Sequence, residues 1–280
     1  MHLGVVMTGA GAHAAACVGV LRELERRGIA PYAVCGIQAG AWPAALLAAG
    51  LSVSSMEKAL HQAAQTGGRM IAPVWYERIA GCGMPCGVRL NRLLGVQTGQ
   101  RILSLCPGTA VFPCRMSRTG QRVIFSTRAY MQDAGSMLAT QASISFAARA
   151  CMGFAPFLAP VEYMGSPLLG ETDLAFACRQ LMLLGAQRVL LIEPTPSPRR
   201  TADALDLASG LLRMAAQQTY ERDISVLHVP MPDTAGALSL TELEACARAG
   251  EAAAAASLDA VLDHMGMARC RILPFRRLHG

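Results

Sequence analysis

The segment Gly36-Ile37-Gln38-Ala39-Gly40 has the glycine spacing of a nucleophile elbow, but its central position is a glutamine. In such an elbow a strand turns sharply into a helix, and the two glycines let the backbone close so tightly that the central side chain stands above the sheet. The nitrogen lone pair of a carboxamide is delocalised into its carbonyl, so a neighbouring base cannot activate it as it activates a hydroxyl or thiol. The sequence therefore predicts that Gln38 is not a nucleophile.

The residues around the pentapeptide fit the elements that an elbow requires. Residues 32–35 form a short apolar run, and residues 39–49 are rich in alanine and leucine, as expected for a strand followed by a helix. Upstream, the apolar run Leu3–Met7 leads into the small-residue loop 8–13 and then into another helical pattern. A loop of this kind presents backbone N–H groups to an anion, either a phosphate or the oxyanion of acyl transfer. A dinucleotide site is disfavoured, because Ala14 replaces the third glycine of that motif.

These two motifs, about 25 residues apart and in this order, resemble those of the patatin-like phospholipases. In that family a glycine-rich oxyanion loop precedes an elbow serine, which the aspartate of an Asp-Gly pair activates without a histidine. Residues 147–152, 157–161 and 183–192 are also similar to stretches of the family. The resemblance covers roughly residues 2–265 and implies an α/β fold, a three-layer sandwich with a mostly parallel central sheet.

Carried over residue by residue, the resemblance lacks the residues that catalysis needs. Gln38 stands at the serine position and Gly170 at the aspartate position, with Glu171 beside it. His13 stands where the family usually has Arg or Lys, and Ala14 where it has Gly. The resemblance implies a catalytically degenerate protein that binds a lipid or fatty acyl ligand, or that pairs with an active patatin-like homologue or with itself. The ligand-binding positions it implies are Gly9, Ala10, Gly11, Ala12, His13 and Gln38.

An active phospholipase or esterase with a non-standard nucleophile is the alternative. Thr8 and Cys35 are the candidates, although a buried core position explains Cys35 more simply. Glu171 or Asp173 would supply a carboxylate only if the loop shifted. Two roles are open for Gln38: its carbonyl accepts hydrogen bonds from the loop amides and so stabilises an inactive site, or it contacts the polar end of a ligand. A third possibility is an interaction protein whose pocket has filled in.

Composition predicts a large buried core, and the resemblance implies that residues 1–280 form one patatin-like domain. Of its residues 52% are hydrophobic and 16% charged, and an alternation of strands and helices favours a mostly parallel sheet with helices on both faces. Further strands are expected at 122–127, 187–192 and 224–229. Helices are expected at 53–65 and from Leu240 to about residue 264, the latter with a capping box of Thr241 and Glu244. Residues 66–121 are rich in Gly, Pro and Cys and are expected to be irregular, and the resemblance implies that they form the family's variable cap over an acyl pocket.

Charge and apolar patterning bear on partners and location. The net charge of +6 comes almost wholly from arginine, so contact with an anionic membrane surface is conceivable. The arginines are spread along the chain and aromatic residues are few, which gives nucleic-acid binding little support. We expect no transmembrane segment, since no run of about 18–20 apolar residues occurs. No basic region precedes the first apolar run, which favours a cytoplasmic protein.

The ten cysteines are scattered along the chain, as expected for reduced, packed thiols. Cys82, Cys86, Cys106 and Cys114 are the candidates for a metal or redox site, but their spacing matches no zinc module. We expect neither a metal nor a cofactor.

Overall fold

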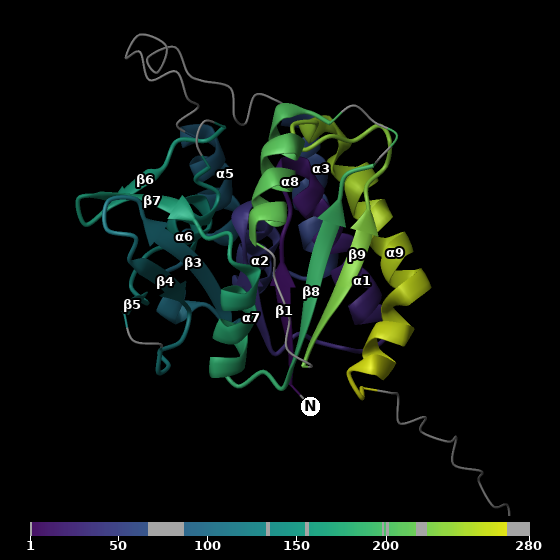
Figure 1. The fold of residues 1–280 in the computed structure, drawn as a ribbon, viewed down its shortest axis with the longest axis horizontal. Helices are drawn as coiled ribbons and strands as arrows, with labels where there is room; N and C mark the ends of the chain where they lie inside the picture. Colours follow the sequence, from purple (N-terminus) through teal and green to yellow (C-terminus); the bar gives the residue numbers. More distant parts are fainter. Residues whose placement is uncertain are drawn as a thin grey trace, which may run out of the picture.

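The computed structural model describes residues 2–66, 87–132, 135–154, 157–197, 199, 202–216 and 223–267, and within 212–216 the backbone alone. At its centre lies a nine-stranded sheet in the order β5-β4-β3-β2-β1-β8-β9, with β7 paired to β3 and to β6 (Figure 1). The strands are β1 (Leu3–Met7), β2 (Ala33–Gly36), β3 (Ala110–Met116), β4 (Arg122–Ser126), β5 (Ser136–Ala139), β6 (Val161–Tyr163), β7 (Ser166–Gly170), β8 (Arg188–Thr195) and β9 (Ile224–Pro230).

The sheet is mostly parallel. β1 lies between β2 and β8 and is parallel to both, and the parallel pairing extends to β3 on one side and β9 on the other. Among the described strands, antiparallel pairing joins β3 to β4 and to β7, and β6 to β7. The α/β fold expected from the sequence is confirmed.

Helices cover both faces of the sheet. α7 packs on one face, against β1, β2 and β8, whereas the larger core cluster on the other face includes residues of α1, α2, α3, α6 and α9 (Figure 1). The helices are α1 (Ala16–Arg26), α2 (Ala41–Ala48), α3 (Val53–Thr66), α5 (Val88–Thr98), α6 (Ile144–Cys151), α7 (Leu174–Leu183), α8 (Ala204–Ala216) and α9 (Leu243–His264), with short 3₁₀ turns η1 (Gly11–Ala15), η2 (Gln38–Gly40), η4 (Leu103–Leu105) and η5 (Leu240–Glu242).

The two helix layers explain why the central strands are apolar without alternation. In β1, Val5 and Met7 belong to the core cluster on one face, while Val6 belongs to the cluster on the other. A strand of a parallel sheet is buried on both faces, so each of its positions is apolar. No helix in the described part of the chain combines the length and the apolar character needed to cross a membrane.

α1 and α9 pack against each other at a point where both helices carry glycine. A Cβ at Gly19 would collide with the carbonyl oxygen of Ala247, and a Cβ at Gly250 would collide with that of Ala16. The two backbones therefore touch directly. This contact places α1, which follows the small-residue loop, at a fixed distance from the C-terminal helix.

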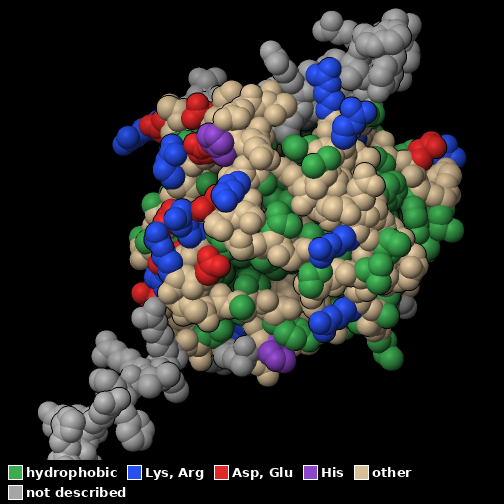
Figure 2. All heavy atoms as spheres, turned by 180° about the vertical axis from the view of Figure 1, so that it is seen from behind, with side chains coloured by type: hydrophobic (Ala, Val, Ile, Leu, Met, Phe, Trp, Pro, Cys, Tyr) green, Lys and Arg blue, Asp and Glu red, His purple; other side chains and the backbone are tan. Residues whose placement is uncertain are grey.

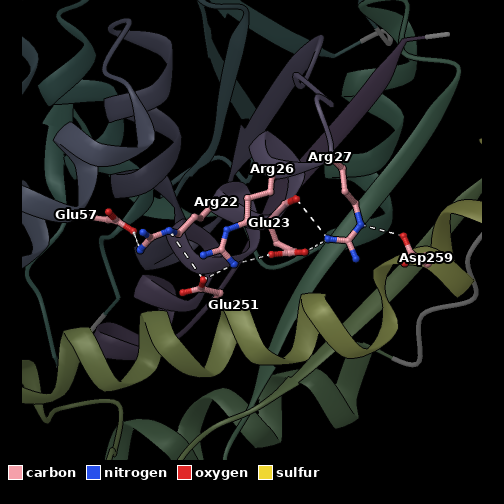
Figure 3. A network of polar contacts seen from close by, with 7 residues as sticks. All are labelled: Arg22, Glu23, Arg26, Arg27, Glu57, Glu251 and Asp259. Carbon is pink, nitrogen blue, oxygen red and sulfur yellow. Dashed lines mark hydrogen bonds and ion pairs between the residues drawn. The ribbon is translucent and has the colours of Figure 1, made fainter. Parts of the chain in front are cut away.

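Charged side chains surround the α1–α9 contact (Figure 3). Arg22 bonds Glu57 of α3 at 2.6 Å, and Arg26 bonds Glu251 of α9 at 2.7 Å. From behind, side chains of both signs gather on the side of the molecule where α9 lies (Figure 2). Exposed pairs of this kind contribute about 0–1 kcal/mol each, so the close backbone packing sets this interface more than the charges do.

Two expectations about local structure were wrong. Residues 66–121 are not irregular throughout: 110–116 is β3, a central strand, and 88–98 is α5, while 67–86 lie outside the described residues. Pro113 made this segment look unlike a central strand, because proline has no backbone N–H to donate to a neighbouring strand. The capping box at the start of the last helix is absent, since a 3₁₀ turn precedes α9 and Glu244 pairs with His61 instead.

We expect Gly19→Ala to destabilise the protein by about 1–3 kcal/mol, the usual cost of overpacking a tight contact. Thermal unfolding of the two proteins measures the difference. Gly210→Ala in α8 is the matched control, because nothing lies within 4 Å of a Cβ at that position. The control should be neutral or stabilise by up to about 1 kcal/mol. Equal losses in both variants would contradict direct backbone contact between α1 and α9.

Candidate functional site

The predicted elbow is present where β2 turns into η2 and α2. Gln38 has a φ of 51°, in the left-handed region that non-glycine residues rarely adopt. Both framing glycines are sterically required: a Cβ at Gly36 would collide with Ala41, and a Cβ at Gly40 would collide with the carbonyl oxygen of Met7. This tight turn holds Gln38 in a conformation that costs an ordinary residue roughly 1 kcal/mol or more.

The small-residue loop lies beside the elbow. The amide of Ala39 donates to the carbonyl of Gly9 at 3.2 Å, and the amide of Ala12 donates to that of Ala237 at 2.8 Å. The amides of Ala10 and Gly11 donate to no acceptor within the described residues. Both residues lie in the loop that precedes α1, next to the elbow.

An apolar cavity of about 110 Å³ opens between the loop and the elbow. A water molecule needs roughly 10–15 Å³ by this measure, so the cavity is large enough for several waters or part of an acyl chain. None of the described side chains that line it is ionisable. They come from the loop, the elbow, α2, α5, the segment after α6, α8, the segment before α9 and the first residue of α9: Ala10, Gly11, Gln38, Ala39, Trp42, Leu90, Met152, Phe154, Phe157, Leu158, Leu205, Ser209, Ala237, Leu238, Leu240 and Leu243.

Gln38 lines this cavity, and within the described residues its side chain makes no hydrogen bond to the loop amides. The expected stabilisation of the loop by the Gln38 carbonyl is therefore not observed. The structure instead places Gln38, whose backbone is left-handed, in the lining of the cavity. The Gln38 carboxamide can therefore donate and accept hydrogen bonds with a molecule in the cavity.

Gly170, at the aspartate position, ends β7 and packs on α6. A Cβ at this position would collide with the carbonyl oxygen of Cys151, and the Gly170 amide donates to the carbonyl of Gly153 at 3.0 Å. No side chain fits at Gly170 unless α6 or β7 moves. An aspartate introduced there would disturb this packing.

The neighbouring carboxylates are held by arginines. Glu171 is 2% exposed and accepts from Arg115 at 3.0 Å and from Arg122 at 2.9 Å. Asp173 accepts from Arg122 at 2.8 Å and caps α7 through the amide of Phe176. Neither carboxylate lines the described cavity. The loop shift that would bring one of them to Gln38 would break these ion pairs.

The pKa of Glu171 lies below its ordinary value. Burial pushes this pKa upward, but the amide of Thr172, the charge of Arg115, the hydrogen bond from Arg122 and the amide of Asp173 together outweigh burial. Glu171 is thus held as a carboxylate, an acceptor for the two arginines rather than a proton carrier.

The substitute nucleophiles are also engaged elsewhere. The Thr8 hydroxyl is buried and donates to the carbonyl of Ile192 at 2.8 Å. Cys35 is fully buried in the core cluster on the α7 side of the sheet, and burial raises the pKa of its thiol well above the ordinary value. A nucleophilic cysteine requires the opposite, a lowered pKa.

His13 is buried and does not line the cavity. Its Nε2 lies 3.1 Å from the carbonyl oxygen of Ala235, and its Nδ1 lies 3.6 Å from a carboxylate oxygen of Asp206. Both neighbours are acceptors, so His13 joins the loop to α8 and to the segment before α9. Of the residues proposed from the sequence, Ala10, Gly11 and Gln38 border the cavity, whereas Gly9, Ala12 and His13 support its wall.

Sequence reasoning missed α8, and it predicted a helix from Leu240 without placing residues 237–243 at the site, although both segments line the cavity. The repeated leucines at 205, 207 and 211 were the available signal for an amphipathic helix. Of the four cysteines considered for a metal site, Cys82 and Cys86 lie outside the described residues, whereas Cys106 and Cys114 lie within them. No group of three or more potential metal ligands occurs among the described residues.

Comparison with known proteins supports the fold. The chain is similar in structure to VipD from Legionella pneumophila, with a TM-score of 0.54 and 13% identity over 93% of this chain and 67% of VipD. It also matches the type III effector protein ExoU, with a TM-score of 0.39 and 14% identity over 89% of this chain and 52% of ExoU. A third match is full-length ExoU from Pseudomonas aeruginosa in complex with SpcU, with a TM-score of 0.36 and 17% identity over 90% and 52%.

No family model and no curated protein matches the sequence. The chain spans about half the length of ExoU. The TM-scores of 0.39 and 0.36 are too low to indicate a shared fold. At 13% identity the VipD superposition shows the fold alone, which agrees with the patatin-like α/β fold expected from the sequence.

We expect Gln38→Gly to be neutral or to stabilise the protein by up to about 1 kcal/mol, because glycine adopts positive φ without strain. Ala39→Gly, one residue further in the same turn, is the control and should lose about 0.5–1 kcal/mol. Chemical unfolding of both variants gives the comparison. A loss in Gln38→Gly as large as in the control would mean that contacts of the glutamine side chain outweigh the backbone strain.

We expect Glu171→Gln to destabilise the protein at neutral pH by about 1–3 kcal/mol, since both arginines lose a charged acceptor. The folded-state pKa of Glu171 is lowered, so its contribution is fully present above the pKa of the unfolded chain, about 4.3. The contribution disappears as the pH falls through the folded pKa. Unfolding measured from pH 7 down to pH 3 should therefore show the two proteins converging. A difference independent of pH would contradict an ionised, paired Glu171.

Proposed function

We propose that this protein is a catalytically degenerate member of the patatin-like acyl hydrolases, which binds a lipid acyl group in the cavity beside Gln38. One observation carries the proposal: the strained elbow presents a carboxamide to an apolar cavity whose described lining side chains include no ionisable group. The fold shared with VipD is consistent with it.

Acyl transfer requires a nucleophile and a group that takes its proton. Gln38 cannot be the first, and Thr8 and Cys35 are used in hydrogen bonding and core packing. For the second, Gly170 has no room for a side chain and Glu171 is paired with two arginines. These features support binding without turnover.

The cavity suits a ligand with an apolar chain and one polar end. Its walls are leucine, methionine and aromatic side chains, which favour an acyl chain because burial removes apolar surface from water. The lining also includes Ala10 and Gly11 of the loop and the polar side chain of Gln38. An ester or acid carbonyl oxygen accepts hydrogen bonds from a carboxamide, so the polar end of the ligand is expected beside Gln38.

Ala39→Phe tests the binding site, because Ala39 lines the cavity and a phenyl ring would occupy its space. With NBD-labelled dodecanoate as the fluorescent probe, we expect at least tenfold weaker binding than in the native protein. Ala256→Phe, the same change at an exposed position of α9, should bind the probe as the native protein does. Equal binding by both variants, or none by the native protein, would overturn the proposed site.

Catalysis is tested separately with p-nitrophenyl butyrate. The native protein should hydrolyse it no faster than a heat-inactivated sample, and fluorophosphonate and iodoacetamide probes should label no residue that lines the cavity. Turnover that disappears on Thr8→Val or Cys35→Ala would contradict the degenerate interpretation and identify the substitute nucleophile.

A further inference from the structure

α8 carries exposed leucines on the face opposite to the one that lines the cavity. Leu205 and Ser209, four residues apart, line the cavity. Leu207 and Leu211, also four residues apart, are 60% and 67% exposed. Each residue advances an α-helix by about 100°, so the second pair lies on the opposite side from the first. Packing within the described fold explains only the inner pair.

The outward direction of the second pair follows from how α8 is held. Asp203 accepts from the amides of Leu205 and Asp206 at the start of the helix, at 3.1 and 2.9 Å, and from the amide of Leu238 at 3.0 Å. Asp206 in turn lies beside His13 of the loop. These polar contacts tie the first turn of α8 to both walls of the cavity, so the helix cannot rotate to bury Leu207 and Leu211 without breaking them.

Leu238 joins the outer surface to the cavity. It lines the cavity and is nevertheless 40% exposed. Because its amide bonds the residue that caps α8, it lies at the first turn of that helix. A surface that includes Leu238 together with the exposed leucines of α8 therefore reaches the lining of the cavity. Figure 1 shows α8 in front of the sheet, at the end where β1 and β8 terminate.

We propose that Leu207, Leu211 and Leu238 form the surface by which this protein docks on a lipid bilayer, with the cavity mouth facing the acyl chains. The proposal deepens the proposed function and rests on it. Continuity of the patch with the cavity favours a bilayer over a protein partner, because a bilayer presents both an apolar layer for the leucines and acyl chains for the cavity. An amphipathic helix lying in the interface buries its outward apolar side chains in this way.

Charge agrees with this occupant. Of the acidic side chains in α8, Asp206 is 4% exposed and directed to His13, and Asp203, just before the helix, is engaged by three amides. The chain as a whole carries a net charge of +6. An anionic bilayer surface attracts such a protein, and no exposed carboxylate on the described part of α8 opposes the approach.

Co-sedimentation with vesicles tests the proposal on the full chain. The test variant is Leu207→Gln with Leu211→Gln, which keeps good helix-forming residues while removing the outward apolar groups. The control is Leu105→Gln with Leu183→Gln, two leucines that are 72% and 41% exposed elsewhere on the surface. Vesicles of phosphatidylcholine with about one-third phosphatidylserine, and vesicles of phosphatidylcholine alone, are used for each protein. Binding of NBD-labelled dodecanoate and thermal unfolding are measured in parallel.

We expect the native protein and the control to sediment with the vesicles, and the test variant to show at least tenfold lower partitioning with unchanged unfolding temperature and probe binding. Equal partitioning of test and control variants would overturn the proposal, as would a native protein that binds neither kind of vesicle. Binding that survives the leucine changes but vanishes on vesicles without phosphatidylserine would assign the contact to charge alone, against the proposal. If the native protein binds vesicles but does not bind NBD-labelled dodecanoate, the proposed function is overturned instead.

Discussion

The close approach between Gly40 and the carbonyl of Met7 is the contact on which the rest of the site depends. Since a Cβ at Gly36 or Gly40 would collide with neighbouring backbone, only glycines let the start of α2 pack against the ends of β1 and β2. That packing forces the residue between them into the left-handed region, with a φ of 51° for Gln38. The turn also sets the loop amides beside the elbow, through the bond between Ala39 and Gly9. Geometry that would serve a nucleophile is thus produced by sterics alone, independently of the side chain it presents.

A strained backbone conformation costs roughly 1–3 kcal/mol and persists only where the surroundings impose it. Here the surroundings are two glycines and the ends of two buried strands, so the strain is independent of any reaction. What the elbow presents decides the chemistry. A carboxamide donates and accepts hydrogen bonds but supplies no electron pair for acyl transfer, so the residue at this elbow is suited to hydrogen bonding and not to covalent chemistry.

The charged residues near the site serve the scaffold. Glu171 and Asp173 bind Arg115 and Arg122 at the junction of β3, β4 and α7, and Arg122 also stacks over the ring of Phe176 at 3.9 Å. Buried carboxylates need such partners, because an unpaired one would cost several kcal/mol. Glu171 and Asp173 are paired with arginines away from the cavity, and α6 leaves no room for a side chain at Gly170. The described lining of the cavity is therefore mostly apolar. An apolar cavity that opens beneath exposed leucines of α8 is suited to ligands that are themselves held in an apolar phase.

The sequence by itself determined the elbow, the loop before it and the parallel strands β1, β2, β8 and β9, because glycine spacing and unbroken apolar runs are local signals with few structural solutions. It also determined that Gln38 is no nucleophile, which follows from the chemistry of an amide. Only the tertiary structure decided what surrounds them. The collision at Gly170 comes from α6, the pairing of Glu171 from β3 and β4, and the outer wall of the cavity from α8. β3 escaped prediction because Pro113 masks a strand whose partners, β2, β4 and β7, are distant in the chain. Such features depend on which segments meet in space, and no local pattern of residues records that.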